Sequence, residues 1–241
     1  MTQLTGTGPA VVAQGLYEQS VSALHNLGEL VHSNDGRAFR YCKAGGTALE
    51  AGKLQQSSAQ DTGDHNLAVA ATAAGLKTIT TVGTVTVTAN QYASGFVVIA
   101  DDAGEGYMYR ISSHPAATAA VVTLTLADEV QVALTASTTI DIIKNPYEGV
   151  IVNPTTISSA PAGVAVKPLT ASYYGWLQVS GPCAIFADDT IAVGLDVVAS
   201  ATVAGAVEVT ADGAPEIMSV VGTAIVAGTD AEYVPINLRL M

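Results

Sequence analysis

Short runs in which apolar and polar residues alternate dominate the sequence beyond residue 84. This two-residue period, bounded by Gly, Asp, Asn and Pro, is typical of half-buried β-strands. A first series of strands is expected at 84–88, 95–100, 107–112, 121–126, 130–134 and 138–143, and a second at 163–166, 174–179, 183–186, 195–199, 206–209 and 236–240. The pattern therefore predicts an all-β protein with mainly antiparallel sandwich, jelly-roll-like or barrel lobes.

The N-terminal segment follows a different pattern. Residues 1–24 mix Gly, Pro, Gln and Ser with scattered apolar positions, which predicts an extended arm. We expect one short helix within 16–30 and little helix elsewhere.

A β-hairpin is expected next, because alternating runs flank the Asn-Asp-Gly turn at 34–36. In its second strand the two-residue period places Phe39 and Tyr41 on one face. The same period places Arg40 and Cys42 on the other face.

A stretch rich in Ser, Gln, Asp, Thr and Ala, 55–75, interrupts the strands and predicts a loop or a link. Three parts are therefore expected: an N-terminal arm and hairpin at 1–60, a β lobe at 61–150, and a second β lobe at 151–241. The two lobes either stand apart or form one domain. Similar short pieces recur without a fixed period, which disfavours a solenoid or a propeller.

Charge is scarce in this chain. Only 12% of its 241 residues are charged, against about 25% in an ordinary soluble domain. The formal net charge is −12, which repels phosphate backbones and anionic membrane surfaces, so neither nucleic acid nor membrane is expected as a partner. A surface so poor in charge is typical of a subunit that its neighbours cover.

The start of the chain lacks a basic region followed by an apolar block, and no stretch approaches the roughly 18 apolar residues of a membrane span. We therefore expect synthesis in the cytoplasm. Cys42 and Cys183 lie far apart, without a second Cys or a His at metal-ligand spacing, and are expected to be small buried hydrophobes.

Candidate catalytic and ligand-binding motifs fail on spacing. The Gly-rich string at 45–53 ends in Gly-Lys, but it lacks the phosphate-loop spacing, and Leu54 replaces the hydroxyl that magnesium needs. We expect a turn between strands there. The four histidines show no metal-ligand spacing, and no Gly-x-Ser-x-Gly elbow is present.

Two acidic turns are weak candidates for a calcium site or a glycosidase pair, because they lack the ladder of ligands that defines a calcium loop. We expect their carboxylates to satisfy local backbone donors and to stay hydrated. No enzymatic activity, metal or cofactor is predicted. The turns contain Asp101, Asp102 and Glu105 in one case and Asp188 and Asp189 in the other.

Two groups of residues are candidates for contact with a protein partner. One is a basic window in an acidic chain, suited to an acidic partner surface or simply to solvent. The other is an aromatic group that could anchor a partner, stack on a sugar, or pack in the core. The candidate contacts are Arg37, Arg40 and Lys43, with Lys53 nearby, and Tyr173, Tyr174 and Trp176.

Five segments together resemble virion structural proteins of tailed bacteriophages, of the capsid decoration or cement type. They read DGRAFRYCKAGGTALEAGKL, GFVVIADDAGEGYMYRIS, NPYEGVIV, YYGWLQVSGPCAIF and VPINLRL. The resemblance implies a protein without catalytic residues that binds the outside of an assembled head as a homotrimer and clamps neighbouring major capsid subunits. It implies a location on the virion surface after synthesis in the host cytoplasm.

Alternatives remain open at this point. A tail or baseplate subunit would share the same strand pattern and low charge. A carbohydrate-binding or adhesion module would use Tyr173, Tyr174 and Trp176. In the decoration protein, the region up to Lys53 is expected to reach across to a neighbour, because an arm adds contact area and avidity on a lattice.

Overall fold

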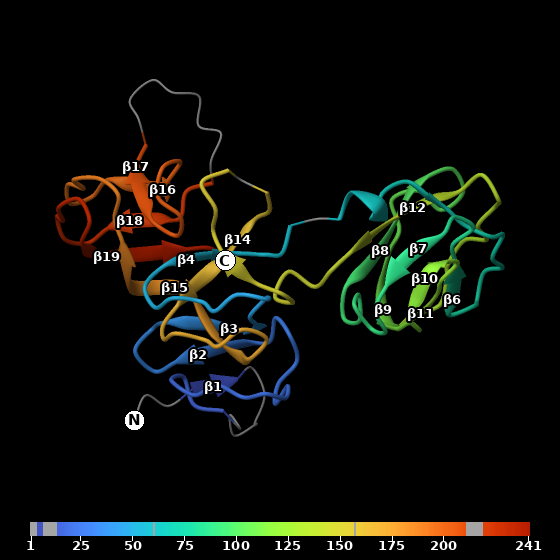
Figure 1. The fold of residues 1–241 in the computed structure, drawn as a ribbon, viewed down its shortest axis with the longest axis horizontal. Coiled ribbons are helices and arrows are strands. Elements are labelled where there is room, and N and C mark those ends of the chain that lie inside the picture. Colours follow the sequence, from blue (N-terminus) through green and yellow to red (C-terminus); the bar gives the residue numbers. More distant parts are fainter. Residues whose placement is uncertain (1–3, 7–13, 60, 157, 211–218) are drawn as a thin grey trace. The chain divides into compact units, whose positions relative to one another are not determined.

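The computed structural model describes residues 4–6, 14–59, 61–156, 158–210 and 219–241 (Figure 1). Its regular structure is almost entirely antiparallel β, with curled sheets that form half-barrels. The one helical element among these residues is a single 3-10 turn, η1 (Thr62–Asp64). The predicted all-β class with little helix is therefore confirmed.

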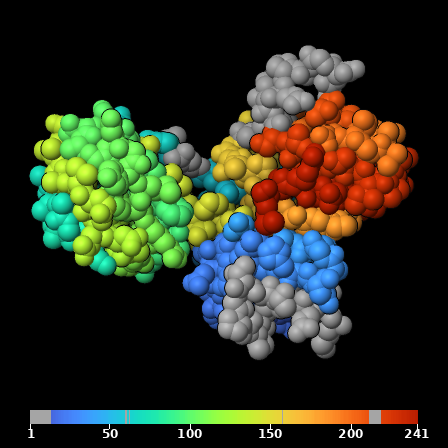
Figure 2. Space-filling view, turned by 180° about the vertical axis from the view of Figure 1, so that it is seen from behind, coloured from blue at the N-terminus to red at the C-terminus, as the bar shows by residue number. Residues whose placement is uncertain are grey.

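The chain divides into two units. The first, here called the split unit, combines Met1–Ala59 with Pro146–Met241. The second, the inserted unit, consists of Gln60–Asn145. Each packs as a body of its own (Figure 2). This differs from the expected three parts, because the hairpin predicted as a separate N-terminal piece is hydrogen-bonded into the C-terminal sheet.

The split unit contains one branched sheet. Its main path runs β1-β2-β3-β15-β19-β18-β16-β17, and β4, β13 and β14 branch from it. The strands are β1 (Leu4–Gly6), β2 (Leu30–Ser33), β3 (Ala38–Lys43), β4 (Leu54–Gln56), β13 (Ile151–Val152), β14 (Pro161–Ala165), β15 (Tyr174–Phe186), β16 (Asp196–Ala199), β17 (Val207–Val209), β18 (Gly222–Ala224) and β19 (Tyr233–Arg239).

Strand β15 is the axis of this sheet. Its first half pairs with β3, with Trp176 opposite Tyr41, and its second half pairs with β19, with Ile185 opposite Val234. The register on β3 shifts between Gln178 and Ser180, where the strand changes partner. The two runs predicted at 174–179 and 183–186 are thus one strand with a bulge rather than two strands.

The predicted hairpin is present as β2 and β3, and Gly36 in its turn has φ +86°, a conformation that favours glycine. The two faces of β3 are buried in different clusters. Phe39 and Tyr41 pack in one cluster, and Cys42 packs in another. The alternation predicted for this strand is therefore confirmed, and its unexpected feature is that both faces are covered.

The inserted unit contains a six-stranded antiparallel sheet, ordered β5-β12-β8-β9-β11-β6, and a separate pair, β10-β7. Its inner side chains form a single apolar cluster that includes Val97, Tyr109 and Ile140. The strands are β5 (Leu67–Ala68), β6 (Thr78–Thr80), β7 (Val85–Val87), β8 (Phe96–Asp101), β9 (Met108–Ser113), β10 (Ala117–Ala120), β11 (Thr123–Leu126) and β12 (Thr139–Ile143).

Two predicted elements are wrong. No helix forms at 16–30, where Ser20 instead exchanges backbone hydrogen bonds with Tyr174 across the sheet edge. No strand forms at 130–134, where the backbone of Val130 bonds to Gly75 and Leu76 in an irregular segment. In both places tertiary hydrogen bonds replace the local pattern.

Part of the predicted arm, residues 1–3 and 7–13, lies outside the described residues. Leu4–Gly6 forms β1 and pairs with β2. Among the described residues, none belongs to a helix with the length and apolar character needed to cross a bilayer.

A buried acidic group lies inside the inserted unit. Asp64, at the end of η1, is buried and accepts a hydrogen bond from the Tyr92 hydroxyl. The backbone N–H of Tyr92 donates to Nε2 of the buried His114 at 3.0 Å. Burial raises the pKa of Asp64, the nearby charge of Asp61 acts in the same direction, and the Tyr92 hydrogen bond opposes both.

We predict that Asp64 makes the inserted unit less stable as the pH rises above the carboxyl's usual pKa of 3.8. The folded state holds this proton more tightly than the unfolded state, so its contribution is complete below pH 3.8 and is lost as the pH passes the raised pKa. The slope is at most about 1.4 kcal/mol per pH unit for one proton.

The measurement is hydrogen exchange of β8 and β9 between pH 4 and 7, corrected for intrinsic rates, in the natural chain and in Asp64→Asn. The asparagine keeps an oxygen for the Tyr92 hydroxyl and cannot ionise. We expect a smaller loss of protection with rising pH in the variant. Equal pH slopes in the two proteins would contradict the prediction.

Candidate functional site

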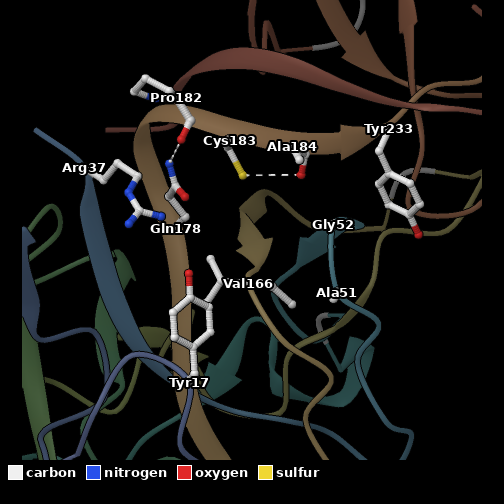
Figure 3. A pocket seen from close by; sticks show the side chains of 11 residues that line it. Tyr17, Arg37, Ala51, Gly52, Val166, Gln178, Pro182, Cys183, Ala184 and Tyr233 are labelled. Atoms are coloured by element: carbon white, nitrogen blue, oxygen red, sulfur yellow. Dashed lines mark hydrogen bonds between the residues drawn. The ribbon is translucent and has the colours of Figure 1, made fainter. Parts of the chain in front are cut away.

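A hollow of about 370 Å³ opens on the surface of the split unit. Residues distant in sequence form it: the segment before β2, the turn before β3, the turn before β4, the end of β14, the middle of β15 and the start of β19. Figure 3 shows Tyr17 and Arg37 on one side of the hollow and Tyr233 on the other. Its lining consists of Tyr17, Arg37, Ala51, Gly52, Ala165, Val166, Gln178, Pro182, Cys183, Ala184 and Tyr233.

Tyr233 forms a fixed wall of this pocket although its side chain is 55% exposed. Its ring meets Phe186 edge to face, with centroids 5.3 Å apart. On the other side it lies against Gly52, where a β-carbon would stand only 2.5 Å from the Tyr233 Cε1 atom. Gly52 also has φ +69°, so glycine serves both the turn and the close approach of the ring.

The opposite wall combines Tyr17, 59% exposed, with Arg37. The guanidinium is held by the Asp35 carboxylate, with Nε at 2.8 Å and Nη2 at 2.7 Å from Oδ2. It also lies over the Phe39 ring, with its central carbon 5.3 Å from the ring centroid. The Arg37 hydrogen bond lowers the pKa of Asp35 to about 2, so the pair stays charged at neutral pH.

The floor contains the buried amide of Gln178. Its Nε2 donates to three backbone carbonyls in succession, those of Ser180 at 3.1 Å, Gly181 at 3.2 Å and Pro182 at 2.8 Å. These bonds hold the bulge at which β15 changes partner. The pocket floor and the bend of the sheet are therefore one structure.

Both cysteines are free and buried, as predicted. Cys183 borders the pocket, and its thiol points to the Ala184 carbonyl with a sulfur-to-oxygen distance of 3.5 Å. Burial raises the pKa of Cys183 to about 12, and burial also raises the pKa of Cys42. Both are protonated at neutral pH and therefore poor nucleophiles.

The basic residues predicted to act together are divided between the two faces of β3. Arg37 borders the pocket, and Lys43 pairs with Glu148 at 2.7 Å while lying over the Tyr174 ring. Arg40 points to the other face, where it donates to the Gly28 carbonyl at 2.8 Å and lies over Tyr147.

The fourth basic residue, Lys53, pairs with Glu50 at 3.0 Å. Each of the four cations therefore has a local partner, and they do not form one common face.

The three aromatic candidates also have different surroundings. Tyr173 and Tyr174 are half-buried, and Tyr174 stacks on Tyr41 with centroids 6.0 Å apart. Trp176 is only 1% exposed, lies 4.9 Å from the Tyr41 ring, and donates from Nε1 to the Gln14 carbonyl at 3.2 Å. Of the three alternatives for Trp176, the structure bears out packing in the core, and its buried ring is not open to a partner or a sugar.

The acidic turns bind local hydroxyl groups. Asp102 accepts from the Thr135 hydroxyl, and Asp188 accepts from those of Ser200 and Thr202. These hydrogen bonds lower the pKa of both carboxyls. Across the described ranges, no three His, Cys, Asp or Glu side chains gather in a way that could hold a metal ion.

The principal residues of the pocket were not predicted from the sequence, apart from Arg37. The order of strands in the sheet is what brings together Tyr17, Gln178 and Tyr233, which are far apart in the sequence. A partial signal existed at Gly52, which lies in the Gly-rich string at 45–53. That string forms a turn between β3 and β4, as expected, and its last glycine makes room for Tyr233.

Comparisons of the chain with protein-family models, with curated proteins and with solved structures gave no significant match. The geometry of the two units is therefore the basis for the functional argument.

We predict that Trp176→Ala destabilises the split unit by about 3 to 5 kcal/mol, because it removes a fully buried indole and leaves a cavity. Trp176→Phe should destabilise the unit less than Trp176→Ala, because it keeps an aromatic ring beside Tyr41. Its remaining cost comes from a smaller ring and from the loss of the hydrogen bond to the Gln14 carbonyl. Denaturant unfolding followed by circular dichroism measures both. An unfolding free energy for Trp176→Ala within 1 kcal/mol of the natural value would contradict the core position of this ring.

Proposed function

We propose that the chain is a non-enzymatic structural protein of a tailed-phage virion, which binds the outside of the assembled capsid and joins neighbouring major capsid subunits. The observation that carries this proposal is the pocket of the split unit, where two tyrosines that are each more than half exposed line one hollow, Tyr17 beside Arg37 and Tyr233 on the opposite side. Tyrosine and arginine are among the residues that concentrate binding energy at protein interfaces. The resemblance of the sequence to decoration proteins supports the same role.

The pocket has the properties of a socket for a side chain of a neighbouring protein. Tyr233 is fixed between Phe186 and Gly52, so its ring loses little conformational freedom when a partner binds. Arg37 is already neutralised by Asp35, so covering it does not bury a lone charge. An apolar or aromatic side chain would fill the hollow between the two tyrosines.

The low charge of the chain favours a contact surface that is wider than the pocket alone. With 12% charged residues in the whole chain, a neighbour could cover a wide surface of this protein at little cost in desolvated charge. A subunit that binds only the expanded shell adds its binding free energy to the stability of that state. Repetition on the lattice, as the proposed homotrimer, multiplies the effect through avidity.

The proposal predicts that purified protein co-sediments with expanded heads assembled from the capsid protein of its own phage, and that Tyr233→Ala weakens this binding at least tenfold. The loss follows from removing a preorganised aromatic anchor. Tyr107→Ala is the matched control, because Tyr107 is an exposed tyrosine of the inserted unit that does not line the pocket. Circular dichroism checks the fold of both variants.

Failure of the natural chain to bind heads would overturn the decoration role. Labelling of the tail instead of the head in electron micrographs would select a tail or baseplate subunit. Equal binding by the natural chain and Tyr233→Ala would remove the pocket from the contact.

A further inference from the structure

One part of the outer face of the inserted unit's sheet is unusually apolar for a surface that faces solvent. One face of an antiparallel sheet packs on the core, and the other is ordinarily polar. Three adjacent strands of this sheet are β12, β8 and β9 (Figure 1). Their alternating burial leaves two rows of side chains on the face away from the core. Direct cross-strand pairing aligns Ile143, Phe96 and Arg110 in one row and Asp141, Val98 and Met108 in the next.

These six side chains, here called the outer grid, lie opposite to the buried set. Along β8, Val97 and Ile99 are buried in the core of the unit, whereas Phe96 and Val98, which alternate with them, are partly exposed. On β9, Met108 is 58% exposed. Four of the six positions are thus apolar, in contact across the strands, and open to solvent.

The two charges of the outer grid occupy opposite corners. Arg110 donates to the Ser94 hydroxyl at 3.2 Å and has no carboxylate partner among the described residues. Asp141 uses only Oδ1 within the described part of the chain, accepting from the Asn66 N–H at 2.8 Å and lying 3.4 Å from Nδ1 of His65. A cation and an anion are therefore each available for one further partner.

This arrangement is complementary to itself. A two-fold axis in the plane of the face, perpendicular to the diagonal from Arg110 to Asp141, would place Arg110 of one copy over Asp141 of the other, and the reverse. The apolar corners, Ile143 and Met108, would then lie near the axis and face their own counterparts. An isologous contact requires this kind of self-complementary patch.

We propose that the outer grid is a two-fold contact between two copies of this chain. Apolar burial at Phe96, Val98, Met108 and Ile143 stabilises the pair, and the two reciprocal Arg110 to Asp141 bridges set its orientation. The strands of the two sheets then cross at a steep angle, as in orthogonal sheet packing. A contact of this symmetry joins subunits in pairs and does not close a trimer, so it is separate from the proposed capsid-binding pocket.

Light scattering of the full-length protein over a concentration series tests the proposal. We expect a molar mass that corresponds to an even number of chains, either a dimer or two rings, such as the proposed trimers, joined through this contact. Met108→Glu should halve the molar mass, because it places two like charges near the axis. Val82→Glu is the matched control, since Val82 is also 58% exposed in the inserted unit but lies in a turn outside the grid. This control should keep the natural mass.

Charge reversal tests the orientation. Arg110→Glu and Asp141→Arg should each weaken the pair at least tenfold by opposing like charges, and the double variant should recover most of the loss. Circular dichroism verifies the fold, because Asp141→Arg also removes the bond to Asn66.

A monomer at 100 μM, or a trimer whose mass Met108→Glu leaves unchanged, would overturn this contact. Neither result would bear on head binding, which is measured separately. Loss in both single charge variants without recovery in the double variant would overturn the two-fold orientation.

Discussion

The bend of β15 at Gln178 is the constraint on which the split unit depends. One strand has to serve three partners, β3 and β14 along its first half and β19 along its second. In a strand without a bulge, the pairing with β3 would continue along the second half of β15. The bulge ends that pairing. The Gln178 amide lies at this bulge and donates to three successive carbonyl groups of the same strand, so it ties the backbone on the far side of the bulge to the buried side chain.

The same bend links the cores of the split unit and forms its pocket. Before the bend, Trp176 packs with Phe39 and Tyr41, and after it Ile185 packs with Val234. The hollow lies where the two halves diverge, so its walls come from elements on both sides. This explains why Tyr17 and Tyr233, at opposite ends of the sequence, face one another there.

Local patterns were sufficient for most strands and for the hairpin at 34–36, because alternation and turn residues act over a few positions. They were insufficient at 16–30, where bonds to β15 replace helical ones, and at 130–134, where backbone contacts with 72–76 replace a ladder. The role of Trp176 depended on burial, which its own neighbours in sequence do not determine. Local sequence patterns could not predict the pocket. Its walls come together because β15 pairs with different strands along its two halves, and that pairing is a property of the whole sheet.

The discontinuity of the split unit has a consequence during synthesis. The β2-β3 hairpin leaves the ribosome early, but the strand that covers its open edge, β15, follows only after the whole inserted unit has been made. At about 5 to 20 residues per second, this delay is on the order of 10 s or more. During that time Phe39 and Tyr41 lack the Trp176 indole against which they pack in the folded protein. The nascent chain therefore exposes apolar side chains on an incomplete sheet. The inserted unit, which is continuous in sequence, has no such waiting period and can complete its own sheet first.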